Sequence, residues 1–191
     1  MPPSSCNLEP FIQATRFWLE KSVIGFNFCP FAKPVFRADA IHYSVITTEN
    51  TADQLEAVAN ELQRLEKQPE IETSLLIFSK GLKDFHQYLD WLELANQLSS
   101  DMGFEGHFQL ASFHPDYCFE GAQTHDASNY TNRSPYPMLH IIREASVEKA
   151  LAHYPNPERI PETNIKVATE QGEEVFKTIL KQSKASFSGS D

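Results

Sequence analysis

The stretch Leu75-Leu76-Ile77-Phe78-Ser79 is the strongest apolar run of the chain and decides its fold. An apolar run of this length without alternation is typical of a β-strand that is covered on both faces. Lys80-Gly81 break the run, and apolar residues at helical spacing lie before and after it in the sequence. A buried strand between two helices predicts an α/β architecture.

The two helices that flank this strand each begin with a capping pattern. Thr51 with Gln54, and Asp84 with Gln87, have the spacing of a capping box. An apolar stripe follows each pattern, comprising Leu55, Val58, Ala59, Leu62 and Leu65 in the first helix and Phe85, Tyr88, Leu89, Leu92 and Ala95 in the second. Stripes of this kind predict amphipathic helices that cover a sheet.

Similar patterns extend to both ends of the chain. They predict further strands over residues 41–47, 106–111 and 138–142, and further helices over 9–22, 146–153, 161–172 and 175–180. We therefore expect a single α/β domain over residues 9–182. It would be a three-layer sandwich with a central, mostly parallel sheet of about four strands, helices on both faces and a helical C-terminal extension. Residues 1–8 would form a flexible N-terminus, and residues 183–191 a disordered tail.

Composition limits the classes of function. The 191 residues carry a formal net charge of −10, which disfavours nucleic-acid binding. No apolar run approaches the roughly 18–20 residues that span a bilayer, and the N-terminus shows no secretory signal. Cys6, Cys29 and Cys118 are too scattered for a disulfide framework or a CxxC zinc site. We expect a cytoplasmic protein without nucleic-acid or membrane partners, and these patterns do not predict its oligomeric state.

Positive charge is missing from a long stretch in the middle of the chain. No Lys or Arg occurs between Asp84 and Asn132, after which Arg133 and Arg143 stand alone. Arg133 belongs to a turn-rich segment, residues 112–137, that follows the third predicted strand. Ligands of open α/β sheets bind at the carboxyl ends of strands. A connection of this length without regular structure is usually either functional or disordered, and its many aromatic residues favour an ordered one. The segment is therefore the predicted site.

The segment contains one candidate for proton transfer and several for anion binding. His114 can act as a general acid or base with Asp116 to orient it, or it hydrogen-bonds a buried carbonyl while Asp116 caps a turn. Arg133 can bind a carboxylate or phosphate, or it pairs with acids of its own loop. The other expected ligand-binding residues are Tyr117, Asn129, Asn132, Arg143 and Lys80.

Two other titratable side chains are weaker catalytic candidates. Cys29 could be a thiolate nucleophile, but Phe26, Phe28 and Phe31 surround it with apolar surface, which favours a buried and inert thiol. His140 is a lesser candidate for proton transfer. Four histidines lie between residues 107 and 140, yet none has the i, i+4 spacing that makes a metal site a strong prediction. We therefore predict no cofactor, and a divalent metal is the weaker alternative.

Three motifs resemble a known family. They are GFNFCPFA at residues 25–32, ASFHPDY at 111–117, and NYTNRSPYPMLH at 129–140, which Arg143-Glu144 follow. Over Glu9 to Gly172 the chain resembles a bacterial family classed as a conserved domain of unknown function. The resemblance implies a small cytoplasmic bacterial protein and no particular activity, cofactor or site residue. The part of the chain after Gly172 departs from it.

The leading hypothesis is a small cytoplasmic enzyme, a hydrolase or group transferase, that acts on a small anionic metabolite. Arg133, helped by Arg143, would hold the anion, while His114 and Asp116 move a proton. This hypothesis requires Cys29, His114, Arg133 and His140 to converge on one pocket.

Two alternatives belong to other classes. The first is a noncatalytic binding or scaffold protein whose aromatic loops form a protein interface, through Phe26, Phe28, Phe31, Tyr130 and Tyr136. The second is a thiol-redox protein that uses Cys29, although Cys29 precedes the first predicted strand and the chain has no CxxC motif.

Overall fold

The computed structural model describes residues 8–152 and 154–187, which form an α/β fold with one mixed sheet. The strands are β1 (Ile41–Ile46), β2 (Thr73–Phe78), β3 (Phe108–Phe113) and β4 (Met138–Arg143). The α-helices are α1 (Glu9–Trp18), α2 (Ala32–Arg37), α3 (Thr51–Lys67), α4 (Phe85–Asp101), α5 (Glu144–Leu151), α6 (Ile160–Gln171) and α7 (Glu173–Ala185). Short helical turns are η1 (Leu19–Ile24), which continues α1, η2 (Ala127–Thr131) and η3 (Pro157–Arg159).

The sheet has the strand order β1-β2-β4-β3 and is mixed. β1 pairs in parallel with β2, whereas β4 runs antiparallel to both β2 and β3. The expected mostly parallel sheet is therefore corrected to a mixed one. The physical reason lies in the segment between β3 and β4, which is not a helical crossover. It turns the chain back at the end of β3, so that β4 runs antiparallel beside it.

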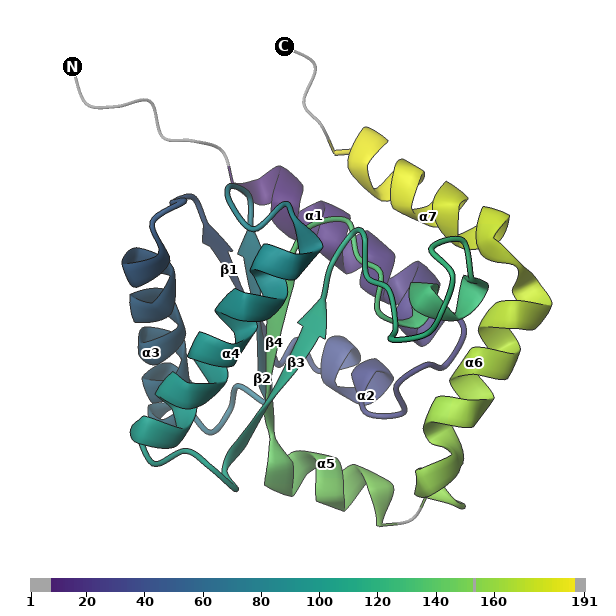
Figure 1. Cartoon of the computed structure of the whole chain (residues 1–191). Coiled ribbons are helices and arrows are strands. Elements are labelled where there is room, and N and C mark those ends of the chain that lie inside the picture. The colour runs from purple at the N-terminus through teal and green to yellow at the C-terminus, as the bar shows by residue number, and fades with distance from the viewer. Residues whose placement is uncertain (1–7, 153, 188–191) are drawn as a thin grey trace.

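Helices lie on both faces of the sheet (Figure 1), and apolar residues form a core on each face. Helices α3 and α4 cover one face, where Leu76 and Phe78 join the core. Segments from α1, η1, α6 and α7 lie on the other face, where Leu75 and Ile77 join a second core. Every residue of β2 is buried, which confirms that the apolar run is a strand covered on both sides.

The helix starts follow the capping patterns with one shift. Asp84 caps α4 as expected, since its side chain accepts the backbone N–H of Gln87. The cap of α3 is Asn50, whose side chain accepts the N–H of Asp53, and Thr51 is the first helical residue instead. Helix α2, which contains Pro34, is not among the helices that the sequence patterns predict.

The C-terminal helices are part of the core and not an extension of it. Phe176 of α7 is only 1% exposed and packs against Phe26, Phe28 and Tyr130. Helix α7 continues through Ala185, past the expected boundary at residue 182. Residues 1–7 of the first predicted flexible end and residues 188–191 of the second lie outside the described residues. In the described ranges, no helix combines the length and the apolar character that crossing a bilayer requires.

Candidate functional site

His114 follows β3 and is fully buried. Its Nε2 donates a hydrogen bond to the carbonyl of Leu82 (3.0 Å), and its Nδ1 accepts one from the backbone N–H of Asp116 (3.0 Å). Burial lowers the pKa of His114, and the Leu82 carbonyl and the nearby carboxylates offset this in part. Both ring nitrogens are thus occupied by backbone groups. Asp116 orients the ring through its backbone, while its side chain is exposed.

Arg133 lies in the same segment and is 8% exposed. Its Nε donates to the carbonyl of Tyr117 (2.9 Å) and its Nη2 to the carbonyl of Thr124 (2.6 Å). Trp18 in turn donates its indole N–H to the carbonyl of Arg133 (3.0 Å). Of the two alternatives that the sequence left open, the guanidinium therefore binds its own segment. It does so through backbone carbonyls and not through acidic side chains.

Asn129 and Asn132 also stabilise this segment. The Oδ1 of Asn129 accepts the backbone N–H of Phe119 (2.9 Å), and its Nδ2 donates to the carbonyl of Gln123 (2.8 Å). The Nδ2 of Asn132 donates to the carbonyl of Ser112 on β3 (3.2 Å). The polar groups that were expected to bind a ligand thus hold residues 112–137 in their conformation.

Arg143 lies at the opposite end of β4 from Arg133. Its guanidinium donates to three backbone carbonyls, those of Leu65 in the last turn of α3 and of Gln68 and Ile71 just after the helix. Because a helix end leaves carbonyls without intrahelical partners, Arg143 stabilises the C-terminus of α3. Lys80 is exposed beyond β2. The structure therefore does not bring the two arginines together at one anion site.

Cys29 and His140, in contrast, line one cavity of about 190 Å³ between the sheet and the N-terminal helical segments. The sheet side of this Cys29–His140 cavity contains residues of all four strands: Ile41, Thr73, Leu75, Ala111, Phe113, His140 and Ile142. The opposite side comes from α1, η1 and the chain around α2: Trp18, Leu19, Val23, Cys29, Phe31, Ala32 and Val35. Only Cys29, Thr73 and His140 bring polar side chains to it. His114 and Arg133 are not among the lining residues. Of the four residues that were expected to meet at one pocket, only Cys29 and His140 therefore do so.

His140 lies on the sheet side of the cavity. Its strand neighbours are Leu75 on β2 and Ala111 on β3, and the small side chain of Ala111 leaves room beside the ring. The Nε2 of His140 lies 2.6 Å from the hydroxyl of Thr73. Burial away from water lowers the pKa of His140 to about 4, so the ring is neutral at pH 7.

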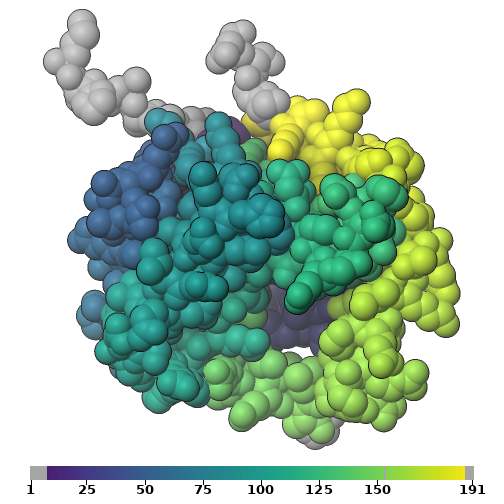
Figure 2. Space-filling view, viewed as in Figure 1, coloured from purple at the N-terminus to yellow at the C-terminus, as the bar shows by residue number. Residues whose placement is uncertain are grey.

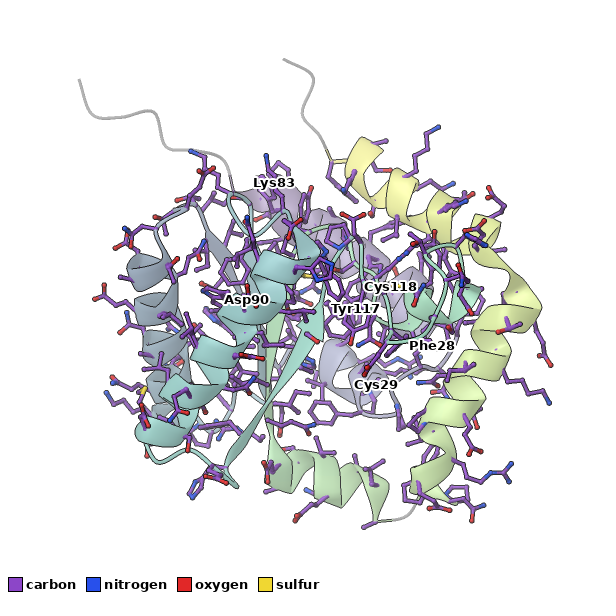
Figure 3. All side chains as sticks on the ribbon, viewed as in Figure 1. Phe28, Cys29, Lys83, Asp90, Tyr117 and Cys118 are labelled. Atoms are coloured by element: carbon purple, nitrogen blue, oxygen red, sulfur yellow. The ribbon has the colours of Figure 1, made fainter. Side chains whose placement is uncertain are left out.

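Cys29 lies across the cavity from the sheet. Figure 3 shows it beside Phe28 near the start of α2, on the other side of the sheet from Asp90 of α4. Burial raises the pKa of the Cys29 thiol, and the backbone N–H groups of Phe31 and Ala32 offset this in part. The thiol is therefore protonated at neutral pH, as the aromatic surroundings in the sequence indicated.

The aromatic loops that suggested a protein interface are mostly core. Phe28, Phe31 and Tyr130 are 5%, 7% and 4% exposed, respectively. Phe26 and Tyr136 are half-buried and pack against the same core. These side chains therefore do not form a contiguous exposed patch.

A groove between α2 and α5 adjoins the Cys29–His140 cavity. Phe31 and Val35 line both spaces, so these two side chains form the wall between them. Helix α5 contributes no buried residue to the fold. Figure 2 shows the surface hollowed above α5, with atoms of the N-terminal segments behind it.

Sequence reasoning missed most of the cavity. Thr73, Ala111 and Trp18 were not candidates, because each looks like an ordinary strand or helix residue. One signal was present in the strand Met138-Leu139-His140-Ile141-Ile142, where a polar ring interrupts apolar residues. A partly buried histidine among apolar strand residues needs a hydrogen-bond partner, which Thr73 supplies.

A buried carboxylate that the sequence did not suggest lies on the face under α3. Glu61 is 3% exposed, and its Oε1 accepts hydrogen bonds from Nδ1 of His42 (2.6 Å) and from the hydroxyl of Ser74 (2.7 Å). Arg64 donates to its other oxygen (3.3 Å). Burial alone would raise the pKa of Glu61, but these donors lower it on balance.

No three His, Cys, Asp or Glu side chains in the described residues are placed to hold a metal ion. A family model described as a protein of unknown function (DUF1415) matches residues 10–178, which include all three motifs and the first turns of α7. No curated protein and no solved structure matches the chain.

Proposed function

The chain belongs to the DUF1415 family of proteins of unknown function, and we propose that it binds a small, uncharged and mainly apolar molecule in the Cys29–His140 cavity. The observation that carries this proposal is the cavity, whose volume is about 190 Å³ and whose lining is apolar except at three residues. An apolar cavity of about 150 Å³ is large enough for benzene. This one therefore suits a six-membered ring with a small substituent.

The lining also supports an uncharged ligand over an ionic one. No Asp, Glu, Lys or Arg lines the cavity. A charge that is buried without a counter-charge costs much free energy. The guanidinium groups of Arg133 and Arg143, which an anionic metabolite would need, donate to backbone carbonyls elsewhere. These contacts favour the cavity ligand over the anionic metabolite that the sequence suggested.

The protonation states support binding over thiol chemistry. Burial raises the pKa of Cys29 and lowers that of His140 to about 4. At pH 7 the cavity therefore holds a neutral thiol and a neutral imidazole, not a thiolate–imidazolium pair. A nucleophilic or redox-active cysteine needs the thiolate.

The test is a titration of uncharged ring compounds, such as benzene and toluene, followed by calorimetry and by thermal unfolding. We expect saturable binding and a rise in Tm, because a ligand that binds only the folded state stabilises it. Benzoate and benzylamine supply charged rings of similar size and are expected to bind more weakly.

The variant Ala111→Leu places extra methyl groups in the cavity and is expected to abolish binding. Ala111→Val is the milder version if the larger side chain disturbs folding. Ala52→Leu, on the exposed first turn of α3, is the matched control. Equal binding of toluene to Ala111→Leu and to the unchanged protein contradicts the proposal, as does the absence of binding by any uncharged ring.

A further inference from the structure

The hydrogen bonds around Thr73 determine which nitrogen of His140 carries the proton. The Thr73 hydroxyl lies 2.6 Å from the carbonyl oxygen of Ile141 and 2.6 Å from Nε2 of His140. A carbonyl oxygen can only accept, so the single hydroxyl proton of Thr73 goes to Ile141. The Thr73 oxygen then accepts a hydrogen bond from Nε2 of His140, so the single proton of the neutral ring lies on Nε2.

The other ring nitrogen is left as an acceptor. Nδ1 of His140 carries a lone pair in this tautomer, and no side chain or backbone group in the described ranges donates to it. The ring lines the Cys29–His140 cavity. Because Nδ1 is an uncharged acceptor in an apolar cavity, a ligand with one hydrogen-bond donor should bind best. A ligand without a donor would leave Nδ1 without a hydrogen bond, which costs free energy.

We propose that the cavity takes a ring compound with a single hydroxyl group, of the phenol class, whose O–H donates to Nδ1 of His140. This inference rests on the proposed function, because it names the class of ligand for the same cavity. The ring would contact the aromatic side chains of Trp18, Phe31 and Phe113, which line the cavity. Trp18 and Phe113 already contact each other edge to face, with ring centroids 5.2 Å apart.

Other ligand chemistries fit the same groups less well. A ketone or ether of equal size offers only acceptors, which cannot bond to Nδ1. A carboxylate or an ammonium group would bring a charge to a cavity that no Asp, Glu, Lys or Arg lines. Cys29 is the other titratable residue of the lining, and its thiol is only a weak donor and acceptor. A ring with one hydroxyl group therefore supplies the donor that Nδ1 of His140 needs and brings no charge into the cavity.

Phenol and toluene form a matched pair of probes, because they differ by a hydroxyl in place of a methyl group of similar size. We expect the unchanged protein to bind phenol about tenfold more tightly than toluene, the effect of one net hydrogen bond. In His140→Phe, which keeps a ring at this position but removes the acceptor, toluene should still bind and the preference for phenol should disappear.

The tautomer has a readout that requires no ligand. Long-range ¹H–¹⁵N spectra distinguish a protonated Nε2 from a protonated Nδ1, and we expect the proton of His140 on Nε2. Thr73→Val removes the acceptor that positions this proton and should allow both tautomers. A proton on Nδ1 in the unchanged protein overturns the inference.

The outcomes separate the two proposals. If toluene and phenol bind equally well and Ala111→Leu abolishes both, the cavity binds apolar rings but the phenol class is wrong. A preference for phenol that persists in His140→Phe also overturns the inference. If neither compound binds, the proposed function fails and this inference fails with it.

Discussion

The guanidinium of Arg133 lies over the ring of Tyr130, with its Cζ 4.6 Å from the ring centroid. Tyr130 is itself buried against Phe176 of α7. A permanent positive charge is thus held between an aromatic face and the backbone carbonyls of residues 117 and 124. The contact between Tyr130 and Phe176 joins the long segment before β4 to the C-terminal helices. By packing on Tyr130, the isolated arginine supports this connection and so has a structural role.

Arg133→Lys should lower the free energy of unfolding by about 2 kcal/mol, because a lysine cannot reproduce two directed hydrogen bonds and the planar stacking. Denaturant unfolding at pH 7 measures the change. Arg37→Lys, at an exposed position, is the control and should stay within about 0.5 kcal/mol. A phosphate-dependent rise in Tm that Arg133→Lys removes would show instead that this arginine binds anions.

Glu61→Gln should destabilise the protein by about 2 kcal/mol at pH 7, because a buried carboxylate with three donors becomes an uncharged amide. The pKa of Glu61 is lower in the folded state than its ordinary value of 4.5. Its stabilisation is therefore complete above that value and is lost as the pH falls through the folded pKa.

Denaturant unfolding at several pH values checks this sign. The difference between Glu61→Gln and the unchanged protein should shrink below pH 4.5. Glu66→Gln, on an exposed position of the same helix, supplies the comparison. A difference that is constant across this pH range would mean that the charge of Glu61 does not contribute.

Phe176→Ala should cost about 3–5 kcal/mol, the usual range for removing a fully buried aromatic side chain. Val175→Ala, at a neighbouring residue that is 38% exposed, should change stability by less than about 1 kcal/mol. Thermal and denaturant unfolding measure both variants. Equal, small effects would mean that α7 is an appendage and not part of the core.

In the folded protein at pH 7.5, Cys29 should react with iodoacetamide at least about tenfold more slowly than the same residue does in the urea-unfolded chain. The reason is that burial raises the pKa of its thiol. Peptide mass spectrometry follows Cys29 and Cys118 separately. A Cys29 that reacts faster in the folded protein than in the unfolded one would revive the thiol-redox hypothesis.

Local sequence patterns predicted the elements but not every contact between them. The run from Leu75 to Phe78 and the cap at Asp84 both appear in the structure where they were expected. The shift of the other cap to Asn50 shows the limit, because Asn50 and Thr51 are both good capping residues. Only the observed hydrogen bond distinguishes them.

The candidate site was less predictable, because its residues have partners that are distant in the sequence. Arg143 binds carbonyls more than 70 residues away, at and just after the end of α3, and His140 binds Thr73 at a separation of 67 residues. A sequence pattern shows that a guanidinium or an imidazole is present. It does not show whether a backbone carbonyl elsewhere already occupies that group.

The sequence by itself determined the α/β class, the strand that is buried on both faces, and the resemblance to a family that the family model confirms. These depend on residues close together in the chain, where periodicity and capping act. The tertiary structure alone decided that β4 runs antiparallel between β2 and β3. It also separated His114 and Arg133 from the cavity that Cys29 and His140 share. Pairing and packing between distant segments place those side chains, and local preference does not encode which segments will meet.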